Sequence, residues 1–124
     1  MSQTTKDNLR NEYLRKYPNS ILRREASYKY NCHSYAWYSQ SWGNDIWMES
    51  PSQYMKDPYY TQVSSSRAGA RIYYVGKHTG IVEADGSRVT SKWGDGPLFS
   101  HSRQNCPYYH TSTGGITQIQ YWIH

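Results

Sequence analysis

Residues 70–92, ARIYYVGKHTGIVEADGSRVTSK, carry the pattern that decides the fold. Three segments rich in β-branched and aromatic residues, 70–75, 78–84 and 87–92, are separated by two short turns. Asp85-Gly86, in the second turn, is a dipeptide typical of a two-residue hairpin. Residues 116–123, ITQIQYWI, alternate well enough to predict one further strand. The C-terminal half therefore predicts an antiparallel meander, followed by a loop at 93–97.

The N-terminal part of the chain predicts helices. Residues 5–17, TKDNLRNEYLRKY, place apolar side chains on one side and basic ones opposite, as in an amphipathic helix that Pro18 ends. Thr5 or Asp7 can cap its start. Residues 32–40 predict a second helix, with Asn31 at the capping position.

The segment 41–66 predicts a long aromatic loop with one helical turn near 52–55. Helices followed by an antiparallel sheet indicate a single α+β domain over residues 1–124. Its parts are a helical region at about 5–40, the aromatic loop 41–66 and a sheet at about 68–123.

Composition excludes several classes of protein. The 124 residues contain no apolar run of about 18, so no membrane span is expected. Fourteen Tyr and five Trp against one Phe predict a core of rings with polar tips, which must find partners inside. The net charge is +5, but the basic residues are dispersed and match no nucleic-acid-binding motif, so no nucleic acid partner is expected.

Cys32 and His78 are the pair of residues that most strongly indicates a catalytic site. Cys32 opens the predicted helix, where the helix dipole lowers the pKa of a thiol. His78 opens a strand, which puts its ring at the rim of the sheet. A nucleophilic thiol needs such a base, and the base needs an acceptor on its other nitrogen. Ser91, Asp85 or a backbone carbonyl can supply that acceptor.

The blocks Tyr30-Asn31-Cys32-His33-Ser34-Tyr35-Ala36-Trp37 and His78-Thr79-Gly80-Ile81-Val82 resemble the CHAP and NlpC type of papain-like cysteine hydrolases. The blocks at 31–36 and 91–94 are also similar to those of small, mostly secreted bacterial proteins. This resemblance implies a helix packed on an antiparallel sheet, and cleavage of amide bonds in peptides or peptidoglycan. It further implies a protein that needs no cofactor and is secreted or associated with the cell wall, although the chain shows no signal peptide. We also expect a monomer and no bound metal.

The resemblance also implies roles for individual residues. Cys32 is the nucleophile and His78 the general base, and the Cys32 backbone N–H with Tyr30 holds the oxyanion. Ser91 takes the third position, where the family usually has His, Asn, Gln or an acid. His33, turned away from Cys32 by about 100° of helix, is expected at the surface or behind the site. Most rings are expected to fill the core, and a cleft for substrate is expected to be lined by Tyr35, Trp37, Trp47, Trp93 and His101.

Several alternatives remain open at this point. A disulfide between Cys32 and Cys106 would remove the nucleophile. His101, Cys106 and His110 match no standard zinc spacing. The same Cys–His site also suits a transglutaminase- or deamidase-like acyl transferase or toxin. A different class is a non-catalytic binding module whose contact surface is the loop 41–60, or an inhibitor or toxin that acts by stoichiometric binding.

Overall fold

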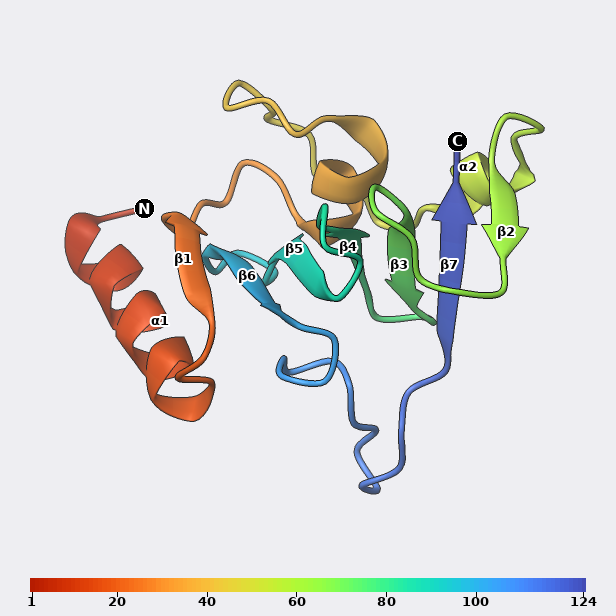
Figure 1. Cartoon of the computed structure of the whole chain (residues 1–124). Helices are drawn as coiled ribbons and strands as arrows, with labels where there is room; N and C mark the ends of the chain where they lie inside the picture. The colour runs from red at the N-terminus through yellow and green to blue at the C-terminus, as the bar shows by residue number, and fades with distance from the viewer.

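The predicted meander forms the centre of one seven-stranded antiparallel sheet, in a computed structural model that describes residues 1–124. The strand order is β1-β6-β5-β4-β3-β7-β2, so the four central strands follow one another along the chain (Figure 1). The strands are β1 (Ile21–Arg24), β2 (Thr61–Val63), β3 (Arg71–Tyr74), β4 (His78–Val82), β5 (Arg88–Lys92), β6 (Leu98–Ser102) and β7 (Ile119–Ile123). All pairings are antiparallel, which confirms the meander.

The first predicted helix is confirmed as α1 (Gln3–Lys16), which lies beside β1 (Figure 1). It starts two residues earlier than expected because Ser2, rather than Thr5 or Asp7, caps it: the Ser2 hydroxyl accepts the Thr5 N–H at 3.1 Å. Its C-terminal tyrosines, Tyr13 and Tyr17, pack edge-on against Trp93, with ring centroids 5.1 and 5.3 Å apart. Aromatic contacts therefore hold α1 on the sheet.

The second predicted helix is shorter than expected. Residues 32–38 are helical, and most of them form a π-helix, η1 (Ser34–Tyr38). The Asn31 cap is confirmed, since its side-chain oxygen accepts the Ser34 N–H at 3.1 Å. Ser39 is extended and closes the segment by donating to the Ser34 carbonyl at 3.0 Å, so residues 39 and 40 lie outside the helix.

The loop 41–66 contains more regular structure than the sequence predicted. The expected helical turn is present as α2 (Ser52–Lys56), and β2 forms an edge strand beside β7. β1, at the opposite edge, and β6 were also not predicted. The chain is therefore a single α+β domain in which the sheet predominates. None of its helices combines the length and apolar character needed to span a bilayer.

The sheet buries residues on both of its faces. Side chains of neighbouring residues in β4 point to opposite faces. One face carries a core that α1 and the segment 103–110 cover, formed by Ala70, Ile72, Tyr74, Val82, Val89, Trp93, Phe99, Cys106 and Tyr121. The other face packs against η1 and the residues before it, including Tyr30 and Tyr35. Consecutive residues of a strand alternate between faces, so His78 and Thr79 lie on opposite sides.

Candidate functional site

Thr79 is the point where the helical segment meets the sheet. β4 pairs with β5 only through Ile81 and Val82, which leaves the first half of β4 without a strand neighbour on that side. Residues of the helical segment 32–38 contact this first half of β4 instead. The Thr79 backbone N–H faces the sulfur of Cys32 and favours its thiolate, as do the backbone N–H groups of His33 and Cys32. The Thr79 hydroxyl contacts His33 Nδ1 at 2.8 Å and accepts Trp37 Nε1–H at 3.3 Å.

His78, one residue earlier, is fully buried on the opposite face. Its ring stacks on Tyr108 with centroids 3.8 Å apart and planes 9° from parallel, and Tyr74 lies 5.5 Å away. Neither ring nitrogen has a hydrogen-bond partner. Burial holds the pKa of His78 well below its usual range, and charge on His101 or His33 would lower it further. The imidazole is therefore neutral near pH 7.

Cys32 is 6% exposed, and its environment favours the thiol over the thiolate. Burial raises the pKa of Cys32 to about 11, although nearby backbone N–H groups and Lys92 act in the opposite direction. The expected lowering of the Cys32 pKa is therefore wrong. The helical segment is too short to offset the loss of hydration around the sulfur.

The structure does not join Cys32 to His78. The Cys32 sulfur makes no hydrogen bond with His78, and both ring nitrogens of His78 lack a partner. Neither residue lines the groove at the N-terminal end of the fold or the cavity beside Arg88 and Arg103. The preformed thiolate–imidazolium pair of an activated cysteine is absent from this resting arrangement.

Ser91 does not orient His78, which corrects the expected third position. Its hydroxyl contacts His101 Nε2 at 2.7 Å and accepts Trp93 Nε1–H at 3.1 Å. The other nitrogen of His101 contacts the Ser102 carbonyl at 2.7 Å. Asp85, the alternative acceptor, is exposed in its turn and accepts backbone N–H groups there.

Most of the predicted substrate-binding residues lie inside the protein. Tyr35, Trp37 and Trp93 are buried, and His101 is fully buried, with its pKa lowered to about 4 by burial. Among the five residues expected to line a cleft, Trp47 alone is well exposed, at 46%. The interior placement of the other four follows from their need to fill a core that contains little Leu, Ile or Phe.

Two further expectations about neighbours of Cys32 change. His33 is buried rather than at the surface, and burial lowers its pKa to about 4. Tyr30 is buried with its ring 4.8 Å from Lys92 Nζ, and no hydrogen bond joins it to Cys32. Its expected role at the oxyanion therefore has no support in this geometry.

Lys92 is a residue of the site that sequence reasoning missed. It is fully buried, and its Nζ donates to the carbonyls of Ser27 at 2.7 Å, Tyr30 at 3.0 Å and Gly94 at 2.7 Å. These bonds fix the chain just before Cys32. The only sequence signal for Lys92 is its position in β5. It lies two residues after Thr90 and therefore on the same face of the sheet as Thr90.

Cys106 is a free, buried thiol, as is Cys32, so the disulfide alternative does not apply to this structure. Its sulfur donates to the Arg103 carbonyl at 3.7 Å. His101, Cys106 and His110 do not come together, since no three metal-ligating side chains gather anywhere in the chain.

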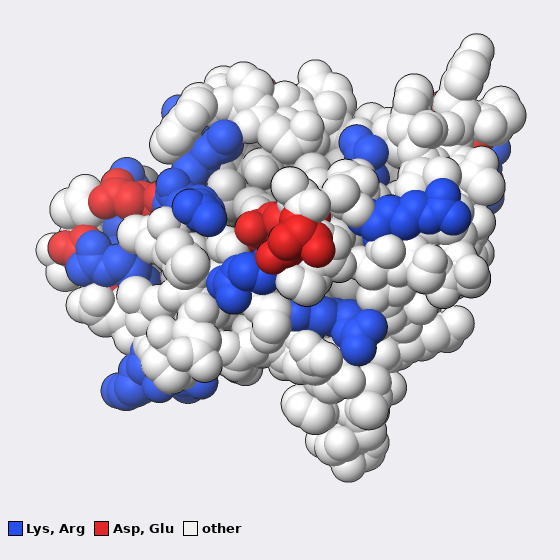
Figure 2. All heavy atoms as spheres, viewed as in Figure 1, with Lys and Arg blue, Asp and Glu red and all other residues white.

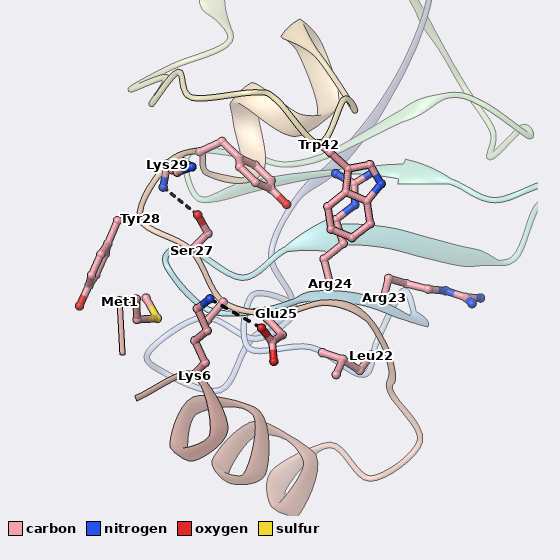
Figure 3. Close-up of a pocket in the computed structure, with 12 residues that line it drawn as sticks. Met1, Lys6, Leu22, Arg23, Arg24, Glu25, Ser27, Tyr28, Lys29 and Trp42 are labelled. Carbon is pink, nitrogen blue, oxygen red and sulfur yellow. Dashed lines mark hydrogen bonds and ion pairs between the residues drawn. The ribbon is translucent and has the colours of Figure 1, made fainter. Parts of the chain in front are cut away.

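A groove of about 710 Å³ lies at the N-terminal end of the fold. It lies between the start of α1, strand β1, the segment 25–30 and Trp42 (Figure 3). On the face of the molecule seen in Figure 2, Lys and Arg side chains are spread out rather than gathered into one large patch.

Comparison of the chain with family models, with curated proteins and with solved structures finds no match. The interpretation of the site therefore rests on its own geometry.

Proposed function

We propose that the protein is a cysteine-dependent amide-bond hydrolase of the papain-like CHAP or NlpC type, acting on peptides or peptidoglycan. The observation that supports this is the unpartnered, fully buried imidazole of His78, one residue before Thr79, whose backbone N–H faces the Cys32 sulfur. An unsatisfied buried polar group costs about 1–3 kcal/mol. Proton transfer to and from the Cys32 thiol, once the site opens, is a function that explains why such a group is kept.

The proposed reaction starts from neutral groups. As the Cys32 sulfur bonds to the carbonyl carbon of the substrate, its proton passes to His78. The Cys32 backbone N–H stabilises the oxyanion. His78 then gives the proton to the departing amine as the carbon–nitrogen bond breaks. Water, deprotonated by His78, attacks the thioester and releases the acid and the free thiol.

This route requires the site to open. The His78 ring must leave its stack on Tyr108 to reach the sulfur, and substrate must displace the side chains that cover Cys32. The proposal therefore includes a closed resting form and an open form that substrate favours. A hydrolase of this type would work outside the cell or at the cell wall, where its substrate lies.

The test is turnover of purified peptidoglycan, and of peptides, under reducing conditions. Wild type and Cys106→Ala should release new amino groups, while Cys32→Ala should release none. Cys106→Ala is a matched control because both thiols are buried and free. Equal release by Cys32→Ala, or none by wild type, contradicts the proposal. Incorporation of an amine into a protein glutamine in place of hydrolysis identifies the acyl-transferase alternative.

A non-catalytic binding module is the second candidate, and the exposed rings of the loop 41–60 favour it. Trp42 is 76% and Tyr59 73% exposed, together with Trp47. Large exposed rings are typical of contact surfaces. This candidate predicts that the protein sediments with peptidoglycan without cleaving it. Trp47→Ala with Tyr59→Ala should abolish sedimentation, and Cys32→Ala should leave it intact.

A further inference from the structure

The groove at the N-terminal end follows an unpaired sheet edge. β1 has β6 on one side and no strand on the other. Leu22, Arg23 and Arg24 of β1 line the groove, together with the segment 25–30. A free edge offers backbone N–H and C=O groups to an incoming extended chain.

The groove carries excess positive charge. Lys6, Arg23, Arg24 and Lys29 line it, against one acid, Glu25. The Lys6 ammonium lies 3.6 Å from the Glu25 carboxylate, and Gln3 also donates to that carboxylate, so the single acid is already occupied. The other three cationic side chains, Arg23, Arg24 and Lys29, have no acidic partner in the groove and can bind an anionic ligand. Such an edge repels a second copy of itself and attracts an acidic strand.

Arg24 lines this groove, and its guanidinium retains an unused donor. Its Nη2 donates to the Gln40 carbonyl at 2.8 Å, and the guanidinium lies 4.2 Å from the centre of the Trp42 ring. Its Nη1 is buried and has no hydrogen-bond partner. Arg24 and Trp42 form one side of the groove and Tyr28 and Lys29 the other, with the Lys6–Glu25 pair between them (Figure 3). Carboxylates suit this fixed, ring-stacked guanidinium.

We propose that this groove binds an extended acidic peptide segment, which adds a strand to the free edge of β1 and places a carboxylate beside the Arg24 guanidinium. An acidic peptide fits both the unpaired edge and the positive charge of the groove, because its backbone pairs with β1 and its side chains neutralise the cations. The site is separate from Cys32 and His78, neither of which lines the groove.

The experiment is a fluorescence-anisotropy titration with a labelled peptide of about eight residues that alternates Glu and Thr, a length that spans β1. Arg24→Gln should raise Kd at least about tenfold, or about 1.4 kcal/mol. Arg67→Gln removes the same charge from an exposed turn outside the groove and should change Kd less than about twofold.

Further variants keep the test decisive. If Arg24→Gln does not fold, Arg23→Gln, which removes an exposed edge charge, should still weaken binding several-fold. An equally acidic peptide with Pro at every second position cannot pair as a strand and should bind much more weakly. Cys32→Ala should bind as wild type does, which separates this proposal from the hydrolase. Equal losses in Arg24→Gln and Arg67→Gln, equal binding of the Pro peptide, or tighter binding of a single-stranded oligonucleotide would overturn it.

Discussion

Replacement of His78 by Phe should make the protein more stable and inactive. The His78 ring is fully buried, and in its neutral form it holds one donor and one acceptor nitrogen without partners. Phe keeps the flat ring that stacks on Tyr108 at 3.8 Å and removes both nitrogens. Because each unsatisfied buried polar group costs about 1–3 kcal/mol, the substitution should gain about 2 kcal/mol or more, less any strain from the slightly larger ring.

The assay is thermal unfolding at pH 7 by calorimetry. A gain of about 2 kcal/mol corresponds to a rise in Tm of roughly 5–10 °C for a domain of this size. His33→Phe is the matched control, because His33 is also buried but contacts the Thr79 hydroxyl at 2.8 Å. Loss of that bond should lower stability by about 1 kcal/mol. If His78→Phe destabilises the protein as much as His33→Phe does, the reasoning about an unpartnered imidazole is refuted.

Three further predictions concern stability. His33 and His101 have folded pKa values of about 4 against 6.5 unfolded, so the unfolded chain binds more protons and stability should fall as pH drops from about 6.5 towards 4. Urea unfolding at pH 5 should show a loss of about 2 kcal/mol per group relative to pH 7, and an unchanged midpoint would contradict this. Gly80→Ala would place a Cβ against the Val89 side chain and 3.1 Å from Ser91 Cβ, which should cost about 1–3 kcal/mol, while Gly43→Ala should be nearly neutral. Lys92→Met leaves three carbonyls without their donor and should lower stability by at least about 3 kcal/mol, and a neutral result in denaturant titration would show that those bonds contribute little.

The central sheet could be predicted because its signals are local. Asp85-Gly86 and the alternating segments on either side specify β4 and β5 without reference to the rest of the chain. β1, β2 and β6 could not be predicted in this way. β1 and β2 are short edge strands, and β6 buries polar residues whose partners come from other strands. The Ser100 hydroxyl donates to Glu83, and His101 contacts Ser91.

The candidate site was predicted in part. Sequence order correctly placed Cys32 after the Asn31 cap and His78 at the start of a strand. It could not reveal that β4 pairs with β5 only through Ile81 and Val82, or that Ser91 contacts His101 rather than His78. Nor could it weigh burial against the helix dipole at Cys32, since burial depends on the whole fold.

The most direct test of the proposed chemistry is detection of the acyl-enzyme by intact-mass spectrometry after rapid acid quenching of a reaction with peptidoglycan fragments. We expect a thioester adduct that maps to the peptide containing Cys32 in wild type and in Cys106→Ala, and that is absent from Cys32→Ala. Product formation without such an adduct at any time point, or the same adduct in Cys32→Ala, would show that Cys32 is not the nucleophile.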